Sequence, residues 1–405
     1  MELLNLFKVL PILILTCLWP QRILANDSFL GANEHAQLNY SIEGHPFIFA
    51  ESFNRKYIAD SRYIVNIGEK KVVLTLDVEM QQNAEQLLRV HDVPWGALVA
   101  LDPKTGKVLA LAGYSANEGG VSDIAVRSGF PAASLFKLIT ASAAIEMAGL
   151  NSDDEIKFRG GNYTLSRGNY LPSDKGDRRS MTLATALGKS INPVFGRIAL
   201  VELERGTLEA YAQSYGFNNE ISFDVPTEIS RFELADDDFE RARTGAGFGN
   251  VTISPLHAAL ITGAIANQGH MMKPYLIDKV YDVQGNNEYE AAESIMKNSV
   301  LPSTASELLE AMKSTVTDGT AKRQFIALRN TRWGDIEVAA KTGTLSGTNP
   351  KGLYLWFVAA APVDDPKIAI AALVIDPGTA RIKGSALGRK FLENFFKSAM
   401  WEMEE

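Results

Sequence analysis

Residues 335–376 read DIEVAAKTGTLSGTNPKGLYLWFVAAAPVDDPKIAIAALVID. The stretch contains three apolar runs, and the turn Val363-Asp364-Asp365-Pro366 separates the second run from the third. Short apolar runs bounded by turn-forming residues are typical of strands. Consecutive strands with short connections pair in antiparallel order. The segment therefore predicts an antiparallel sheet near the end of the chain.

A second sheet signal lies far upstream, in residues 96–113, which read GALVALDPKTGKVLALAG. Two apolar runs flank a turn at residues 102–106, and this pattern predicts a β-hairpin. Residues 71–88 indicate a strand that runs into a helix, and a closing helix is expected over residues 385–400. We therefore predict an α+β fold. Its antiparallel sheet is assembled from both ends of the chain, flanked by helices and joined by an additional, mostly helical subdomain.

Helical signals dominate the middle of the chain. Residues 131–150 read PAASLFKLITASAAIEMAGL, with Pro131 suited to a first helical turn and Gly149 suited to a helix end. They are apolar on nearly every side, which predicts a helix buried on most faces. Loops with short strands are expected in residues 151–180, and further helices over residues 182–187, 193–203 and 254–267.

Composition narrows the class of protein. Of the 405 residues, 46% are apolar and 22% are charged, which suits a globular protein with a substantial core. The net charge is −8 and no long basic run is present, which argues against nucleic acid as a partner. A small peptide substrate remains compatible with this balance.

The N-terminus indicates export. Lys8 precedes an apolar run at residues 9–19, which is shorter than the roughly 20 residues that a membrane span needs. The run fits the core of a signal peptide. We predict a signal peptide or N-terminal anchor over residues 1–25, with membrane association through this segment and an extracytoplasmic location. The only cysteine, Cys17, lies within the run. If residues 1–25 are cleaved off, the mature protein therefore contains no cysteine.

Three short motifs follow one another along the chain: SLFK at residues 134–137, SIN at 190–192 and KTGT at 341–344. Each motif also has a second occurrence elsewhere. Ser-x-x-Lys recurs at Ser294, Ser-x-Asn at Ser52 and Ser115, and Lys-Thr-Gly at Lys104. A single match is therefore weak, and order, spacing and local structure must decide.

Ser134 and Lys137 are spaced to share one face of a helix start. A serine hydroxyl is a poor nucleophile unless a base takes its proton. Lysine can be that base when burial or another cation lowers its pKa, and the neighbours here are apolar. The structural alternative is a serine at a helix N-terminus with a lysine that reaches solvent.

Ser190, Ile191 and Asn192 stand before Pro193, between two predicted helices. The structural interpretation makes Asn192 an N-cap and Pro193 the first helical residue. In the functional interpretation, a tight turn projects both polar side chains into a cleft. The hydroxyl of Ser190 would relay a proton, and the amide of Asn192 would orient the lysine and bind substrate. The two interpretations are compatible.

The third motif ends a predicted strand. Lys341 would be a second cation that keeps Lys137 neutral and attracts a carboxylate. Gly343 lets the backbone approach a ligand closely, and Thr342 and Thr344 supply hydroxyl groups. The alternative is a plain turn, as at Lys104. The apolar strand and the further sheet around this copy favour the functional interpretation.

Other chemistries lack support in the sequence. The stretch TGAGFGN, residues 244–250, lacks the spacing of a phosphate-binding loop. The five histidines show no metal-ligand spacing, and no G-x-S-x-G motif is present. We therefore predict no metal and no cofactor.

Residues 72–400 resemble the transpeptidase domain of penicillin-binding proteins, part of the penicilloyl-serine transferase family. The three motifs match the signature of that family. The resemblance extends to the hairpin at 96–113, to GFGNVTISPLHAALITGAIANQG and to LYLWFVAAAP. It implies a transpeptidase domain over residues 72–405, and the mixed, polar residues before it predict a short N-terminal extension with a few strands over residues 26–71. The chain has no room before residue 72 for a glycosyltransferase or a full-sized pedestal domain, so we expect a stand-alone transpeptidase.

The resemblance also implies a role for each motif residue. Ser134 would attack the penultimate D-alanyl carbonyl of a peptidoglycan stem peptide, with Lys137 as general base. Ser190 and Asn192 would relay protons and bind substrate. The substrate carboxylate would be held by Lys341, Thr342 and Thr344. The backbone N–H groups of Ser134 and Thr344 would form the oxyanion hole.

Several functions share this signature. The implied activity is that of a serine D,D-transpeptidase or D,D-carboxypeptidase that also binds β-lactam antibiotics covalently and works beside cell-wall synthesis proteins. A β-lactamase or a β-lactam sensor on the same fold is one alternative, since the motifs do not reveal how fast the acyl-enzyme hydrolyses. A non-catalytic binding module is another. An exported adhesin or scaffold would need three chance motifs in order.

Overall fold

The computed structural model describes residues 56–401, apart from residues 330, 332 and 333. The predicted signal peptide or anchor at residues 1–25 lies outside the described residues, as does most of the predicted extension at 26–71. Within the part of the chain that is described, no helix is long and apolar enough to cross a membrane.

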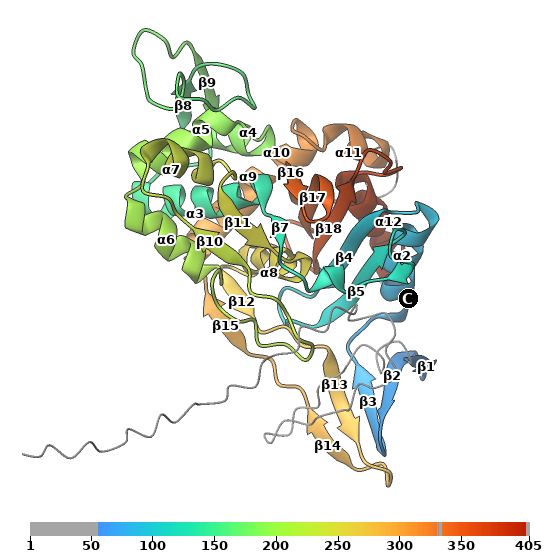
Figure 1. Cartoon of the computed structure of the whole chain (residues 1–405). Coiled ribbons are helices and arrows are strands. Elements are labelled where there is room, and N and C mark those ends of the chain that lie inside the picture. Colours follow the sequence, from blue (N-terminus) through green and yellow to red (C-terminus); the bar gives the residue numbers. More distant parts are fainter. Residues whose placement is uncertain (1–55, 330, 332–333, 402–405) are drawn as a thin grey trace, which may run out of the picture.

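A six-stranded antiparallel sheet forms the centre of the molecule (Figure 1). In spatial order its strands are β16 (Ala339–Thr348), β17 (Lys351–Ala361), β18 (Ile368–Asp376), β4 (Trp95–Leu101), β5 (Val108–Ser115) and β6 (Gly120–Val121). The hairpin and the three C-terminal strands predicted from the sequence are therefore confirmed. Ala369 of β18 pairs with Leu101 of β4, so the two ends of the chain meet in one sheet, as predicted.

Helices cover both faces of this sheet, which explains why the inner strands β18 and β4 are apolar along nearly their whole length. In β18, Ala371 and Leu373 belong to one core cluster together with residues of α8 (Pro255–Ala266). The alternate residues Ala372 and Val374 belong to a second cluster on the opposite face. The helices that contribute most of this second cluster are α2 (Val78–Val90), α11 (Lys322–Arg329) and α12 (Gly384–Trp401), and Val316 joins it from the short helix α10 (Ser314–Thr317).

A mostly helical subdomain lies beside the β16 edge of the sheet (Figure 1). Its helices are α3 (Lys137–Ala148), α4 (Leu183–Gly188), α5 (Asn192–Arg197) with its π-helical continuation η3 (Ile198–Glu202), α6 (Arg205–Ser214), α7 (Asp238–Gly245), α9 (Pro302–Met312) and α10 (Ser314–Thr317). Gly149 ends α3 in the left-handed conformation, with φ of +66°, as its position in the sequence predicted. The predicted fold class is confirmed.

The start of the α3 region differs from the prediction. Pro131 was expected in a first helical turn, but it lies in the short strand β7 (Phe130–Pro131). This strand pairs with β11 (Asn250–Ile253), which in turn pairs with β10 (Arg231–Glu233). The fixed φ of proline suits both settings, and the partner strand lies too far along the chain for a local pattern to reveal it. The helix begins only after the 3-10 turn η2 (Ala133–Phe136).

Smaller sheets complete the fold. One contains β1 (Tyr57–Ala59), β2 (Arg62–Ile67), β3 (Lys70–Leu74), β13 (Ile277–Tyr281) and β14 (Asn287–Glu290). Val72 of β3 pairs with Val280 of β13, so strands from distant parts of the chain build this sheet. Two further sheets have two strands each: β8 (Glu155–Phe158) with β9 (Arg179–Thr182), and β12 (His270–Met272) with β15 (Ile295–Asn298). A 3-10 turn, η1 (Asp123–Ala125), follows β6.

Candidate active site

Ser134 lies in the turn η2, and Lys137 is the first residue of α3. Lys137 Nζ is 2.7 Å from Ser134 Oγ. Ala133, just before the serine, has a φ of +50°, in the left-handed region that alanine rarely adopts. Such strain persists only where the surroundings impose it, and it is frequent at functional sites.

Lys137 is fully buried and has two further partners besides the serine. Its Nζ lies 2.7 Å from Asn192 Oδ1 and 2.6 Å from the carbonyl oxygen of Ala246. Both of these oxygens can only accept hydrogen bonds. A neutral amine satisfies them with its two N–H groups and keeps its lone pair for the hydroxyl of Ser134. Burial, and in second place the charge of Lys341, hold the pKa of Lys137 well below the usual range of lysine.

The SIN motif forms the tight turn between α4 and α5. Ser190 adopts a left-handed φ of +55°, and α5 begins at Asn192 with Ile191 as its N-cap residue. The structural interpretation that made Asn192 the N-cap is therefore wrong. The amide of Asn192 is engaged elsewhere, because Oδ1 accepts from Lys137 and Nδ2 donates to the carbonyl of Tyr163 over 2.8 Å.

Lys341 lies on β16 and is also fully buried. Its Nζ donates to Ser190 Oγ over 3.1 Å and to the carbonyl of Thr342 over 2.7 Å. Burial lowers the pKa of Lys341 to about 7. The residue therefore connects the third motif to the second, while Lys137 connects the second to the first.

Close packing holds the third motif against the serine turn. A Cβ on Gly343 would lie 3.3 Å from Ala133 Cβ and 3.2 Å from Trp356 Cβ, so the glycine permits this approach. Thr342 Oγ1 is 2.5 Å from Thr320 Oγ1. Thr344 is exposed on the same strand.

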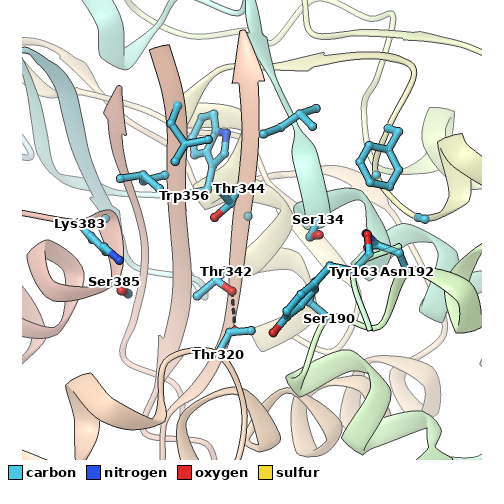
Figure 2. Close-up of a pocket in the computed structure, with 18 of the residues that line it drawn as sticks. Ser134, Tyr163, Ser190, Asn192, Thr320, Thr342, Thr344, Trp356, Lys383 and Ser385 are labelled. Carbon is cyan, nitrogen blue, oxygen red and sulfur yellow. Dashed lines mark hydrogen bonds between the residues drawn. The ribbon is translucent and has the colours of Figure 1, made fainter. Parts of the chain in front are cut away.

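The three motifs line one cleft with a volume of about 700 Å³ (Figure 2). The predicted residues Ser134, Ser190, Asn192, Thr342, Gly343 and Thr344 line it directly, and Lys137 and Lys341 lie buried behind them. The structure thus brings all eight predicted residues together. Further lining residues were not predicted: Tyr163, Ala246, Gly247, Phe248, Thr320, Trp356, Asp376, Lys383 and Ser385 among them.

One of the unpredicted features had a visible signal. The stretch TGAGFGN, dismissed as a phosphate-binding loop, supports the serine turn instead. A Cβ on Gly247, whose φ is +93°, would lie 2.2 Å from the carbonyl oxygen of Ala133 and 2.9 Å from the nitrogen of Ser134. A glycine cluster that fits no known loop can therefore still indicate a close approach of two backbones. Tyr163 and Thr320 carry no comparable signal.

The second copies of the motifs lie elsewhere. Lys104 is in the β4–β5 turn, where its Nζ pairs with Asp365 at 2.5 Å. Ser115 donates to the carbonyl of Pro94 over 3.0 Å. Ser294 precedes β15, which contains Lys297, so this Ser-x-x-Lys has no helix. Ser52 lies outside the described residues.

Fold and site together define a class. An antiparallel sheet, a helical subdomain and a serine beside a buried lysine are the arrangement of the active-site serine proteins that react with penicillin. Within this class, the sequence of residues 96–400 matches the protein-family model of the penicillin binding protein transpeptidase domain. The chain therefore belongs to the penicillin-binding protein transpeptidase family, as its motifs indicated.

Two curated relatives illustrate the similarity. The peptidoglycan D,D-transpeptidase PbpA of Mycobacterium tuberculosis is 28% identical over 343 residues, which cover 74% of this chain and 66% of the relative. Stage V sporulation protein D of Bacillus subtilis is 24% identical over 355 residues, which cover 82% of this chain and 53% of the relative. The chain thus spans between half and two thirds of the length of these relatives.

Solved structures agree with this assignment. The D,D-transpeptidase domain of a peptidoglycan glycosyltransferase from Eggerthella lenta matches with a TM-score of 0.68 and 30% identity, over 81% of this chain and 83% of that one. The penicillin G acyl-enzyme complex of penicillin-binding protein A from M. tuberculosis matches with a TM-score of 0.64 and 25% identity, over 81% of this chain and 80% of that one.

Proposed function

We propose that this protein is a serine D,D-transpeptidase of peptidoglycan synthesis that works outside the cytoplasm through an acyl-enzyme on Ser134. Its substrates would be stem peptides ending in D-Ala-D-Ala, and β-lactams would acylate the same serine. The observation that carries the proposal is the 2.7 Å approach of a buried lysine amine, Lys137 Nζ, to Ser134 Oγ.

Acylation begins when Ser134 Oγ attacks the penultimate D-alanyl carbonyl carbon. Lys137, neutral because it is buried, accepts the hydroxyl proton as the new C–O bond forms. The carbonyl oxygen becomes an oxyanion, which the backbone N–H groups of Ser134 and Thr344 stabilise. Support for Thr344 comes from its place on the edge strand β16, where it lines the same cleft as Ser134.

Expulsion of D-alanine needs a proton on its amine nitrogen. Lys137 now carries that proton, and Ser190 is the relay between the two lysines and the leaving group. The contact from Lys341 Nζ to Ser190 Oγ supports this role, because it orients the hydroxyl. Lys341, Thr342 and Thr344 hold the substrate carboxylate. A pKa of about 7 lets Lys341 carry positive charge when the carboxylate arrives.

Deacylation completes the cycle. An acceptor amine attacks the ester carbonyl and gives a cross-link, or water attacks and trims the peptide, and Ser134 recovers its proton. A β-lactam follows the first half of this path, but its leaving nitrogen stays tethered to the opened ring and remains in the cleft. The acyl-enzyme therefore persists, which makes it the species to measure.

The domain division is part of the proposal. Residues 72–405 would be the transpeptidase domain, and residues 1–25 would export the protein or anchor it to the membrane. Cell-wall synthesis proteins are the proposed partners. The negative net charge and the lack of a long basic run support a peptide substrate over nucleic acid.

Intact mass measurement with benzylpenicillin tests this function, with Ser134→Ala as the control. A long-lived adduct on the wild type that the variant lacks is expected. An adduct that forms and clears quickly while penicillin is consumed would make the protein a β-lactamase. Absence of any adduct would leave a non-catalytic binding module.

A further inference from the structure

Helix α5 is held at both ends by one loop, residues 159–178 between β8 and β9. At its first residue, the backbone N–H of Asn192 donates to the carbonyl of Asn162 over 2.8 Å, and Nδ2 donates to the carbonyl of Tyr163 over 2.8 Å. At its last residue, Arg197 donates to the carbonyls of Asn169 and Leu171 over 3.0 and 3.1 Å. The loop therefore spans the length of the helix that begins at Asn192, the last residue of the second motif.

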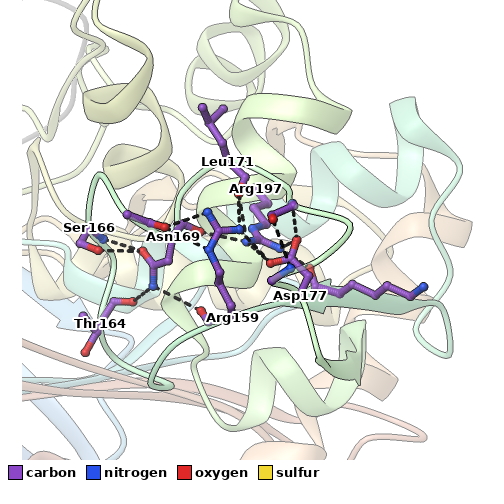
Figure 3. A network of polar contacts seen from close by, with 11 residues as sticks. Arg159, Thr164, Ser166, Asn169, Leu171, Asp177 and Arg197 are labelled. Atoms are coloured by element: carbon purple, nitrogen blue, oxygen red, sulfur yellow. Dashed lines mark hydrogen bonds and ion pairs between the residues drawn. The ribbon is translucent and has the colours of Figure 1, made fainter.

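The far end of this clamp is a buried ion pair. Both nitrogens of the Arg197 fork donate to Asp177, over 2.7 and 2.8 Å, and the two side chains are only 4% and 6% exposed (Figure 3). Arg159 adds a contact to Asp177 of 3.0 Å. Burial opposes the ionisation of Asp177, but these hydrogen bonds outweigh it and hold its pKa at about 2. The carboxylate is therefore charged at every physiological pH.

Side chains inside the loop connect this pair to the cleft. The amide of Asn169 donates to the carbonyl of Thr164 over 2.8 Å and accepts from the backbone N–H of Ser166 over 2.7 Å. The guanidinium of Arg159 donates to the carbonyl of Gly168 over 2.7 Å (Figure 3). A loop of this length with so little regular structure is ordinarily mobile. Here polar contacts fix it between Asp177 and Tyr163.

The contact at Tyr163 has a chemical consequence for the lysine. A backbone carbonyl can only accept, so it requires the NH₂ group of Asn192 to face it. The amide oxygen must then face Lys137, whose N–H it accepts. If the carbonyl moved away, the amide could turn over and present a donor to the lysine, and the amine would lose the orientation that directs its lone pair to Ser134.

We propose that Arg197 and Asp177 are positioning residues for Lys137, which act through the loop at residues 159–178 and the amide of Asn192. The inference rests on the function proposed above. It assigns these residues an effect on the chemical step, whereas an ion pair that only stabilises the fold would change the amount of folded protein and leave the reactivity of each molecule intact.

Acylation kinetics with a fluorescent penicillin separate the two roles. Measured against penicillin concentration, they give the dissociation constant of the initial complex and the rate constant of acylation. For Asp177→Asn we expect the rate constant to fall at least about tenfold, because small displacements of reacting groups are costly, while the dissociation constant stays nearly unchanged. If Asp177→Asn does not fold, Asn169→Ala, which breaks the loop between the pair and Tyr163, is expected to give the same result.

Two controls accompany the variant. Asp174→Asn makes the same change at an exposed position of the same loop, and it should leave both constants unchanged. Leu392→Ala, in the core on the far side of the sheet, should lower the melting temperature without lowering the acylation rate of the folded protein. If the wild type is acylated and folded Asp177→Asn reacts with the same rate constant, the positioning role alone would be overturned. Failure of the wild type to form an adduct on Ser134 would overturn the proposed function, and the positioning role with it.

Discussion

Lys137 on α3 and Lys341 on β16 are both fully buried, and the charge of Lys341 adds to burial in lowering the pKa of Lys137. Ser190, between them in the second motif, accepts a hydrogen bond from Lys341. Two buried cations at one site are unfavourable for folding. The arrangement instead favours a neutral amine beside Ser134, which general-base catalysis requires.

When the acylation rate is plotted against pH, replacement of Lys341 by methionine should move the acidic side of the curve to higher pH. The pKa of Lys137 rises when the neighbouring charge is removed, so a higher pH is needed to deprotonate it. The shift should be seen below about pH 7, where Lys341 is charged. Acylation rates with a fluorescent penicillin between pH 5 and 9 measure it. Lys104→Met, in the other Lys-Thr-Gly, should leave this side of the curve in place, and a shift to lower pH in Lys341→Met would contradict the coupling.

The same lysine should make stability depend on pH. The pKa of Lys341 is about 7 in the folded protein and 10.5 in the unfolded chain, so between these values the unfolded chain binds more protons. Stability therefore rises with pH across that window, and the cost of burying Lys341 is greatest below about pH 7. Urea unfolding gives the free energy of unfolding of the wild type and of Lys341→Met. From pH 7 to pH 10, the free energy of unfolding of the wild type should increase relative to that of the variant. A constant difference would show that the lysine titrates normally.

Lys137→Ala tests the base itself. Loss of a general base typically slows a reaction by about 10²- to 10⁴-fold. Among the described residues, Lys137 is the only one whose amine makes a hydrogen bond with Ser134 Oγ. The acylation rate constant should fall by that factor while Ser134 stays in place. Lys297→Ala, in the other Ser-x-x-Lys, serves as the matched control and should react at the wild-type rate. Acylation of Lys137→Ala at a similar rate would assign the base to another group.

The sheet could be predicted from the sequence because its inner strands are buried on both faces, and continuous apolar runs such as IAIAALVID leave little choice. The grouping of Ser134, Lys137 and Lys341 at one cleft could be predicted because the motifs fix residue types and order. Asn192 shows where local reasoning fails. A helix start with a following proline suggested an N-cap, but the amide has stronger partners in Lys137 and the Tyr163 carbonyl.

The remaining site residues depend on contacts between distant segments. Thr320 contacts Thr342 through their hydroxyl groups, and Ala246 contributes only its backbone carbonyl to Lys137. A carbonyl carries no residue-type signal, and a lone threonine in a polar stretch carries hardly more. Such groups become visible only when the fold places them beside the motifs.

Gly247 offers a test of how closely the backbone around Ser134 is fitted. An alanine there would adopt a φ of +93° and place its Cβ 2.2 Å from the carbonyl oxygen of Ala133. Gly285 in the β13–β14 turn has a similar φ of +84°, but an added Cβ would meet no atom of the described residues within 4 Å. Both alanine variants should lose about 1–2 kcal/mol of stability from the left-handed conformation.

Only Gly247→Ala should also lose activity, because the clash pushes the turn that carries Ser134 away from Lys137 Nζ. We expect its acylation rate to fall at least about tenfold, while Gly285→Ala reacts like the wild type. Thermal unfolding and acylation kinetics on the same samples separate the two effects. Equal acylation rates in the two variants would mean that the serine turn tolerates displacement, and that the 2.7 Å contact between Lys137 Nζ and Ser134 Oγ is re-formed after the backbone moves.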